Sequence, residues 1–169
     1  AYLKSKDAPE FYGTIVKPLD NETKKMPTLH WFIKNEKTID QAINSNQRKG
    51  FRASIYYNEQ FYDNIFNRVR GASGPSFSKK SYKFDFNPGH KFQFLLKQAA
   101  VEEINLNSNY QDKAKVREPL AYETYRKSGV IAPNSFQVRV QRNGKFFSIA
   151  NLTEQIDETF LINRSLDPN

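Results

Sequence analysis

The sequence predicts an α+β fold, in which a mostly antiparallel sheet carries a few short helices. Aromatic residues make up 14% of the chain and alternate with polar residues in several short segments, as strands with one packed face require. Neighbouring strand-like segments are separated by short polar turns, which favours antiparallel pairing. The helical patterns are grouped rather than alternating regularly with the strands, which is typical of α+β proteins.

Composition limits the classes of function. The 169 residues suit one domain of ordinary size, and 26 Lys and Arg against 18 Asp and Glu give a net charge of +8. This charge favours an anionic partner such as a nucleotide. The basic residues are scattered among acidic ones without a long run of like charge, which argues against a nucleic-acid partner. The chain contains no cysteine, which excludes disulfides, Cys-ligated zinc and thiol catalysis.

No motif assigns a catalytic residue or a metal ligand. His30 and His90 are the only histidines and show no metal-binding spacing, and no GxSxG nucleophile motif occurs. No apolar stretch approaches the ~20 residues that span a bilayer, so we expect no membrane span. The chain begins at Ala1 without Met, as removal of a signal peptide or a preceding domain would leave it.

The first elements follow a loose start. Residues 1–27 are polar and form a lead-in with a turn-rich insert, and the apolar run Thr28 to Ile33 predicts a buried strand. Helical spacing within residues 37–49 then predicts a helix, with Thr38 as its N-cap and Gly50 as its stop.

A hairpin and a third strand come next. Strand-like runs at 53–57 and 60–70 flank Asn58-Glu59, a pair that suits a tight turn. On the second run, Arg70 shares a face with Arg68 and Phe66. After the loop that begins at Gly71, aromatic residues at 82, 84 and 86 alternate with polar ones and predict a strand with its aromatics inward.

The second half contains one helix and one clear hairpin. Residues 91–110 mix strand-like and helix-like runs and favour neither. Pro119 suits the first turn of a helix that stops at Gly129. Asn143-Gly144 lies between two alternating runs and is a strong hairpin signature. The tail after Ile156 predicts a short helix followed by a turn.

The loop at residues 70–80 leaves two interpretations open. The glycine-bearing sequence "RGASGPSFSKK" offers backbone N–H groups that can hold phosphate, and a following lysine can reach the same oxygens. The sequence matches neither a P-loop nor a kinase glycine loop, so a basic turn between two strands explains it equally well. Alternating lysine and aromatic residues from Tyr82 to Phe86 are similarly compatible with base stacking or with an ordinary half-buried strand.

Three segments, taken in order, resemble one family. "RVRGASGPSFSKKSYKFDF", "LNSNYQDKAKVREPLAYETYRKSG" and "APNSFQVRVQRNGKFFSIANLTEQID" are similar to successive motifs of the spore-coat protein H-like (CotH) kinase family. The resemblance covers roughly Ala53 to Asp157. It implies the small lobe of an atypical protein-kinase-like fold at residues 28–157, with residues 158–169 starting the connection to a large lobe beyond Asn169.

The resemblance also implies roles for individual residues. The loop Gly71 to Ser78 should lie near the phosphates of ATP, and Lys80 should contact them, with Lys79 and Lys83 as alternatives. A helix carboxylate, Glu123 or else Glu118, should hold that lysine, and the segment 152–156 should receive adenine. The expected cofactor-binding residues are therefore Arg70, Gly71, Ser73, Gly74, Lys79, Lys80, Lys83, Glu123, Glu154 and Ile156.

The function implied is phosphorylation of Ser or Thr in spore-coat or surface proteins with ATP and Mg²⁺, on the spore coat, at the cell surface or outside the cell. The aspartates that serve as base and hold Mg²⁺ come from the large lobe in kinases, so we expect this piece alone not to catalyse. Two positions depart from the family pattern, since Ser148 replaces a glycine and Ala150 an aromatic residue. These departures favour the alternative, a non-catalytic scaffold or interaction domain of a coat or extracellular assembly.

Overall fold

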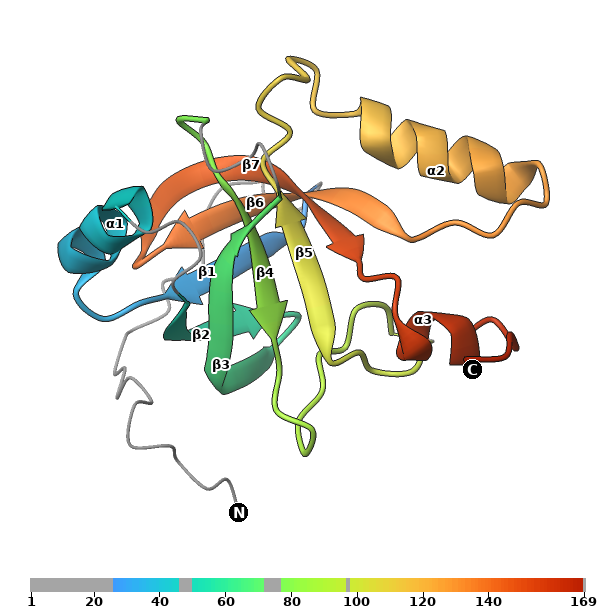
Figure 1. Cartoon of the computed structure of the whole chain (residues 1–169), viewed down its shortest axis with the longest axis horizontal. Helices are drawn as coiled ribbons and strands as arrows, with labels where there is room; N and C mark the ends of the chain where they lie inside the picture. Colours follow the sequence, from blue (N-terminus) through green and yellow to red (C-terminus); the bar gives the residue numbers. More distant parts are fainter. Residues whose placement is uncertain (1–25, 46–49, 72–76, 97, 169) are drawn as a thin grey trace.

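The structure, a computed structural model, describes residues 26–45, 50–71, 77–96 and 98–168. Seven strands form a closed barrel in the order β1-β2-β3-β4-β5-β7-β6 (Figure 1). The strands are β1 (Thr28–Phe32), β2 (Phe51–Tyr57), β3 (Gln60–Arg70), β4 (Ser81–Asp85), β5 (Glu103–Asn107), β6 (Ser135–Arg142) and β7 (Lys145–Glu154). The helices are α1 (Glu36–Ser45), α2 (Arg117–Lys127) and α3 (Glu158–Ile162).

Barrel closure depends on the first strand. β1 pairs antiparallel with β2 and parallel with β6, where Leu29 lies opposite Val140. All other strand pairs are antiparallel, so the sheet is mixed and has no free edge. The predicted α+β class, resembling the small lobe of a kinase-like fold, is therefore wrong: the described residues form a closed seven-stranded β-barrel with a few short helices.

The barrel interior is apolar and rich in aromatic rings. Alternate residues of each strand point inward, as the period of two requires, and Tyr82, Phe84 and Phe86 are buried as expected. Trp31 lies near the centre, with its ring packed against those of Phe51, Tyr82, Phe84 and Phe147. The aromatic residues of β4 therefore serve the core and cannot act as an exposed stacking platform.

Both predicted hairpins are confirmed. Asn58 and Glu59 connect β2 to β3, and Asn143 and Gly144 connect β6 to β7. All four residues have positive φ, which is the backbone geometry of the type I′ turn. The turn at Asn143 also joins distant parts of the chain, because its side-chain amide exchanges hydrogen bonds of 2.9 and 3.0 Å with the backbone of Ile33.

Three helices occur close to their predicted positions. α1 begins at Glu36, two residues before the predicted cap Thr38. Gly50, the predicted stop, lies beyond residues that the structure does not describe and instead permits close approach of the Phe66 ring. α2 begins at Arg117, so Pro119 falls in its first turn, where a missing N–H costs no helical hydrogen bond. α3 is capped by Asp157, whose carboxylate accepts from the Phe160 N–H at 2.9 Å.

The helices cover different parts of the barrel. α1 and α2 lie on opposite sides (Figure 1), and α3 follows directly after β7. Side-chain contacts described below connect α2 with the ends of three strands, β3, β5 and β7. This arrangement creates a polar site between α2 and the outer face of the barrel.

Candidate functional site

A chain of hydrogen bonds joins three strands to α2. The Arg70 guanidinium, at the end of β3, donates to Asn107 Oδ1 on β5 at 2.7 Å. Asn107 Nδ2 in turn donates to Glu118 Oε1 on α2 at 2.8 Å. The same carboxylate oxygen accepts from Thr153 Oγ1 on β7 at 2.5 Å. One carboxylate of α2 therefore fixes the helix to the barrel and holds Arg70 indirectly, through Asn107.

The strand pattern explains why these residues meet. Asn105 and Asn107 lie two residues apart on β5 and so share a face of the strand. Asn105 lies opposite Thr153 of β7, and Thr153 lies opposite Ser135 of β6. The side chains of Asn105, Asn107 and Thr153 point away from the barrel interior, because their neighbours Ile104, Leu106 and Leu152 point inward and are buried. Ser135 Oγ lies 2.8 Å from Thr153 Oγ1 and completes the cluster.

A cavity of about 260 Å³ opens beside this cluster; we call it the α2 cavity. Residues from β3, β5, α2, β7 and the segments next to them form its walls. Its lining residues are Arg70, Asn105, Asn107, Glu118, Tyr122, Pro133, Thr153, Glu154, Gln155 and Ile156. Three of the expected cofactor-binding residues, Arg70, Glu154 and Ile156, thus line one cavity, together with Glu118, the second choice for the helix carboxylate.

Burial sets the electrostatics of the α2 cavity. Burial lowers the pKa of Arg70, while the negative charge of Glu118 opposes that shift. Burial raises the pKa of Tyr122, and the Glu118 charge adds to the effect. A half-buried guanidinium next to a neutral phenol suits an anionic ligand that carries an aromatic or polar body.

Glu154 is committed to a structural ion pair. Its side chain is 1% exposed and accepts from Arg164 at 2.6 Å. It also accepts from the backbone N–H of Asn134 at 3.1 Å. The carboxylate therefore connects β7, the start of β6 and the segment after α3. In the α2 cavity, Glu154 serves as part of the wall.

The three expected lysines lie elsewhere. Lys79 and Lys80 line a second cavity, at the end of the barrel near α1, with Asp40 and Arg142. Lys80 Nζ donates to the Phe77 carbonyl at 3.3 Å. Lys83 forms an ion pair with Glu103 on the neighbouring strand at 2.5 Å. Lys79 and Lys80 therefore line a different cavity from Arg70, Glu154 and Ile156, and Lys83 lines neither cavity.

The remaining expected residues show mixed placements. Glu123 lies on the exposed side of α2 and pairs with Lys127 at 2.6 Å. Gly71 is exposed with a φ of 94°, a conformation that favours glycine. Ser73 and Gly74 lie outside the described residues.

Sequence reasoning did not identify Asn107 or Tyr122, and it included Thr153 only as part of the segment 152–156. The available signal was the polar residues at alternating positions of two strands, Asn105 and Asn107 on β5, and Asn151 and Thr153 on β7. Such residues on a face covered by another element need hydrogen-bond partners. Within the described ranges, no group of three or more His, Asp or Glu side chains is arranged to hold a metal ion. In that same part of the chain, no helix is both long and apolar enough to cross a bilayer.

More than half of the chain matches a known protein family. The sequence profile of the CotH kinase protein family matches residues 67–169. This range includes the α2 cavity, β4 to β7 and all residues of α2 and α3. No curated protein matches the chain.

Proposed function

Because the chain belongs to the CotH kinase protein family, we propose that the α2 cavity binds the nucleotide of a phosphoryl-transfer reaction. The observation that supports this proposal most is the convergence of Arg70, Glu118, Glu154 and Ile156 on one cavity. They come from three separate segments of the chain: the end of β3, the first turn of α2 and the end of β7 with the residues after it.

Arg70 is the proposed phosphate ligand. A guanidinium is planar, stays charged and can donate two parallel hydrogen bonds to phosphate oxygens. Asn107 takes one of its N–H groups at 2.7 Å, which orients the fork and leaves other donors for the ligand. Glu118 holds Asn107 in turn, so it is a positioning residue for Arg70.

The other end of the α2 cavity suits a base. Gln155 and Ile156 follow the last residue of β7 and precede α3, and their backbone groups can pair with the edge of a purine. The Tyr122 ring and Pro133 add apolar surface to the same cavity. A ligand with a planar base and a phosphate tail can therefore satisfy both ends.

The finer steps concern the complete protein. We propose that ATP with Mg²⁺ is the phosphate donor and that Ser or Thr of spore-coat or surface proteins accepts the phosphate. In phosphoryl transfer, catalysis consists almost entirely of positioning and charge stabilisation. On this proposal Arg70 supplies one of the positive charges and the rest of the complete protein supplies the metal ligands.

Isothermal titration of the chain with ATP, with and without Mg²⁺, tests the proposal. We expect saturable binding that falls at least tenfold in Arg70→Ala. Arg68→Ala is the matched control, because it removes the same group from the same face of β3 and does not line the α2 cavity. Equal affinities of the two variants would overturn the Arg70 assignment.

Lys80→Ala is the third arm of this titration. It is expected to keep the affinity of the unaltered chain, because Lys80 lines the other cavity. Loss of ATP binding in this variant alone would return the phosphate site to the lysine.

The scaffold alternative is tested by the same titration. The departures that favour it, Ser148 and Ala150, are buried positions of β7 and do not line the α2 cavity. They therefore leave the proposed nucleotide site unchanged. Absence of ATP binding to the unaltered chain would favour a non-catalytic scaffold.

A further inference from the structure

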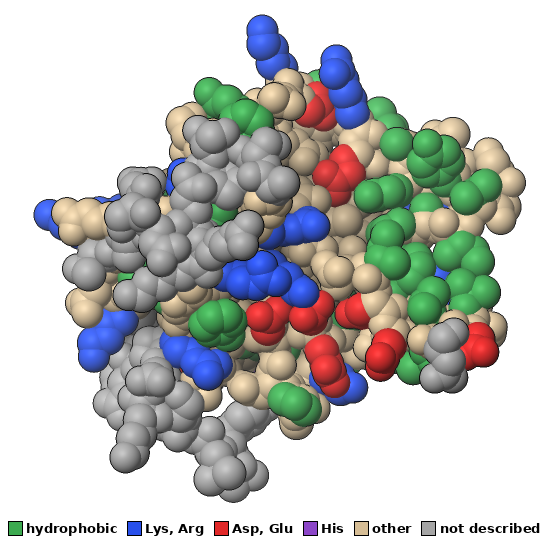
Figure 2. Space-filling model, viewed as in Figure 1, with side chains coloured by type: hydrophobic (Ala, Val, Ile, Leu, Met, Phe, Trp, Pro, Cys, Tyr) green, Lys and Arg blue, Asp and Glu red, His purple; other side chains and the backbone are tan. Residues whose placement is uncertain are grey.

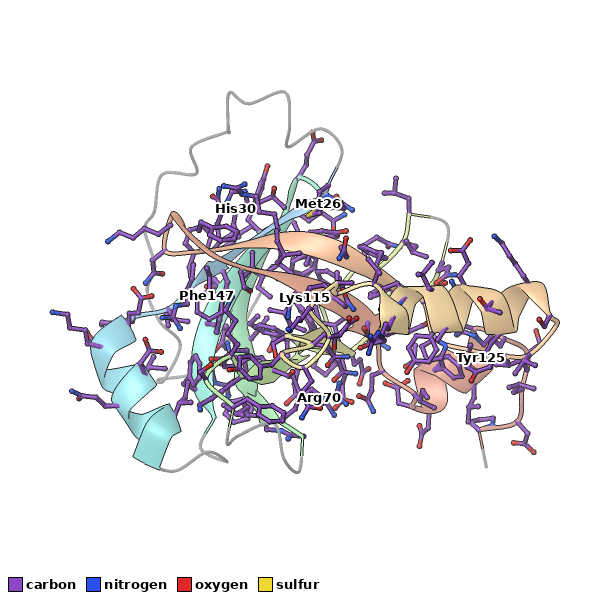
Figure 3. The ribbon with its side chains drawn as sticks, turned by 90° about the horizontal axis from the view of Figure 1, so that it is seen from above. Met26, His30, Arg70, Lys115, Tyr125 and Phe147 are labelled. Carbon is purple, nitrogen blue, oxygen red and sulfur yellow. The ribbon has the colours of Figure 1, made fainter. Side chains whose placement is uncertain are left out.

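A second cavity, of about 300 Å³, lies between α1 and the end of the barrel; we call it the mouth cavity. It shares no lining residue with the α2 cavity. Its lining residues are Asp40, Ile43, Ser78, Lys79, Lys80, Tyr82, Ser108, Arg142, Phe147 and Ser148. Figure 3 places Phe147 on the side of the molecule where α1 lies, away from Arg70.

The charged lining residues of the mouth cavity are mostly cationic. Three of its lining side chains carry positive charge and one carries negative charge. That single carboxylate, Asp40, receives two hydrogen bonds from the Arg142 guanidinium, at 3.0 and 2.7 Å. Arg142 also pairs with Glu36 at 2.6 Å, so two carboxylates of α1 offset its charge, and Lys79 and Lys80 supply the other positive charges of the lining.

The mouth cavity also has aromatic lining residues. Tyr82 and Phe147 line the cavity, and both pack against the Trp31 ring, with centroid distances of 4.8 and 5.6 Å. The Arg142 guanidinium lies 4.4 Å from the Phe147 ring centroid. Burial raises the pKa of Tyr82 to about 12, so the phenol is neutral at physiological pH.

We propose that the mouth cavity binds a small aromatic anion, with its ring against Tyr82 and Phe147 and its carboxylate or phosphate at Lys79 and Lys80. Aromatic surface contributes affinity by burial and ring contact, and ammonium groups bind such anions as point charges. The cavity volume suits a small ligand. The proposal does not rest on nucleotide binding in the α2 cavity.

The single tryptophan of the chain provides a direct readout. Trp31 touches two of the lining rings, so its emission should change when the mouth cavity fills. The probes are phenyl phosphate, benzoate and inorganic phosphate, titrated at constant ionic strength with excitation at a wavelength that they do not absorb. Phenyl phosphate or benzoate is expected to give a saturable change at concentrations at least tenfold below those of inorganic phosphate.

Two sets of variants locate the probe. Lys79→Ala with Lys80→Ala should weaken phenyl phosphate binding at least tenfold. Lys34→Ala with Lys37→Ala is the matched control, because it removes two exposed lysines at and beside α1 that do not line the cavity. Phe147→Leu should weaken phenyl phosphate and leave inorganic phosphate unchanged.

Three outcomes would overturn the proposal. The first is no saturable change with either aromatic probe. The second is equal affinity of the two double-lysine variants. The third is an ATP-dependent change in Trp31 emission that the Lys79 and Lys80 substitutions abolish, which would make the mouth cavity the nucleotide site instead. ATP binding that leaves Trp31 emission unchanged supports two separate sites.

Discussion

The two longer helices are held to the barrel in different ways. α1 contributes Ile43 to the core, where this side chain is 3% exposed, and its acidic residues Glu36 and Asp40 pair with buried Arg142. α2 has no buried residue among its eleven. Its link to the barrel consists of polar contacts through Glu118 and a hydrogen bond from Arg126 to the Pro133 carbonyl.

This difference shows in how each helix is anchored. Apolar packing excludes water and fills space, so Ile43 anchors α1 in the core, although the mouth cavity lies beside the same helix. Hydrogen bonds fix a direction without filling the volume around them, and the α2 cavity remains between the helix and the strands. Hydrophobic side chains such as Leu120 and Tyr125 are correspondingly exposed, and Figure 2 shows side chains of this kind gathered on the side of α2 and α3.

Removal of the buried cation beneath α1 should have the largest effect on stability. Arg142→Gln leaves Glu36 and Asp40 without their partner and removes contacts of the guanidinium with Trp31 and Phe147. Because the two carboxylates are partly exposed, we expect a loss of about 2–3 kcal/mol. Urea unfolding followed by circular dichroism measures it.

The matched control is Arg139→Gln on the same strand. Arg139 is only half-buried and contacts the exposed Phe146 ring, so a loss of less than about 1 kcal/mol is expected. If both substitutions had the same effect, α1 would not depend on the Arg142 ion pairs.

Substitution of the α2 carboxylate should have an intermediate effect. Glu118→Gln removes the charge that accepts from Asn107 and Thr153, and about 1–2 kcal/mol should be lost. Hydrogen exchange of the α2 amides should accelerate while that of α1 is unchanged. Glu123→Gln, on the exposed side of the same helix, should leave both quantities unchanged, and an equal effect of the two variants would contradict the role of Glu118.

Mild acid should produce the smallest effect, on the α1 side. Burial lowers the pKa of His30, on the strand that leads into α1, below its usual 6.5. Below pH 6.5 the unfolded chain therefore binds more protons than the folded one, and this contribution to stability is lost as the pH falls. Burial raises the pKa of Asp85 and Asp157, so these two groups make the folded chain more stable as the pH falls and oppose the effect of His30. The effect of His30 must therefore be measured by comparison with a His30 variant.

His30→Gln isolates the histidine contribution. The unaltered chain should lose more stability than the variant between pH 7.5 and 5.5 in urea unfolding. Hydrogen exchange should accelerate in β1 and not in α2. Identical pH profiles of the two proteins would exclude His30 as the cause.

Local elements were accessible from the sequence, and their assembly was not. The turns at Asn58-Glu59 and Asn143-Gly144 depend on the conformations of two residues each, so a short pattern identifies them. The parallel pairing of β1 with β6 joins segments about 110 residues apart, and no local pattern encodes such a register. The α+β prediction failed at this step, because it left the sheet open.

The candidate site, like the fold, could be predicted only in part from the sequence. Arg70, Glu154 and Ile156 were selected by resemblance, and the structure brings them to one cavity. Lys80 was expected to line the same cavity. A loop separates Lys80 from Arg70 along the chain, and the fold places Lys80 on the mouth cavity instead. The choice between Glu118 and Glu123 depends on which side of α2 faces the barrel, which its weakly patterned sequence does not specify.

The most direct test of the central claim is a crystal structure of the chain with a nonhydrolysable ATP analogue and Mg²⁺. The account predicts the analogue in the α2 cavity, with phosphate oxygens about 3 Å from the Arg70 guanidinium and the base beside Ile156. An analogue bound with its triphosphate at Lys79 and Lys80, with the α2 cavity empty, would contradict it.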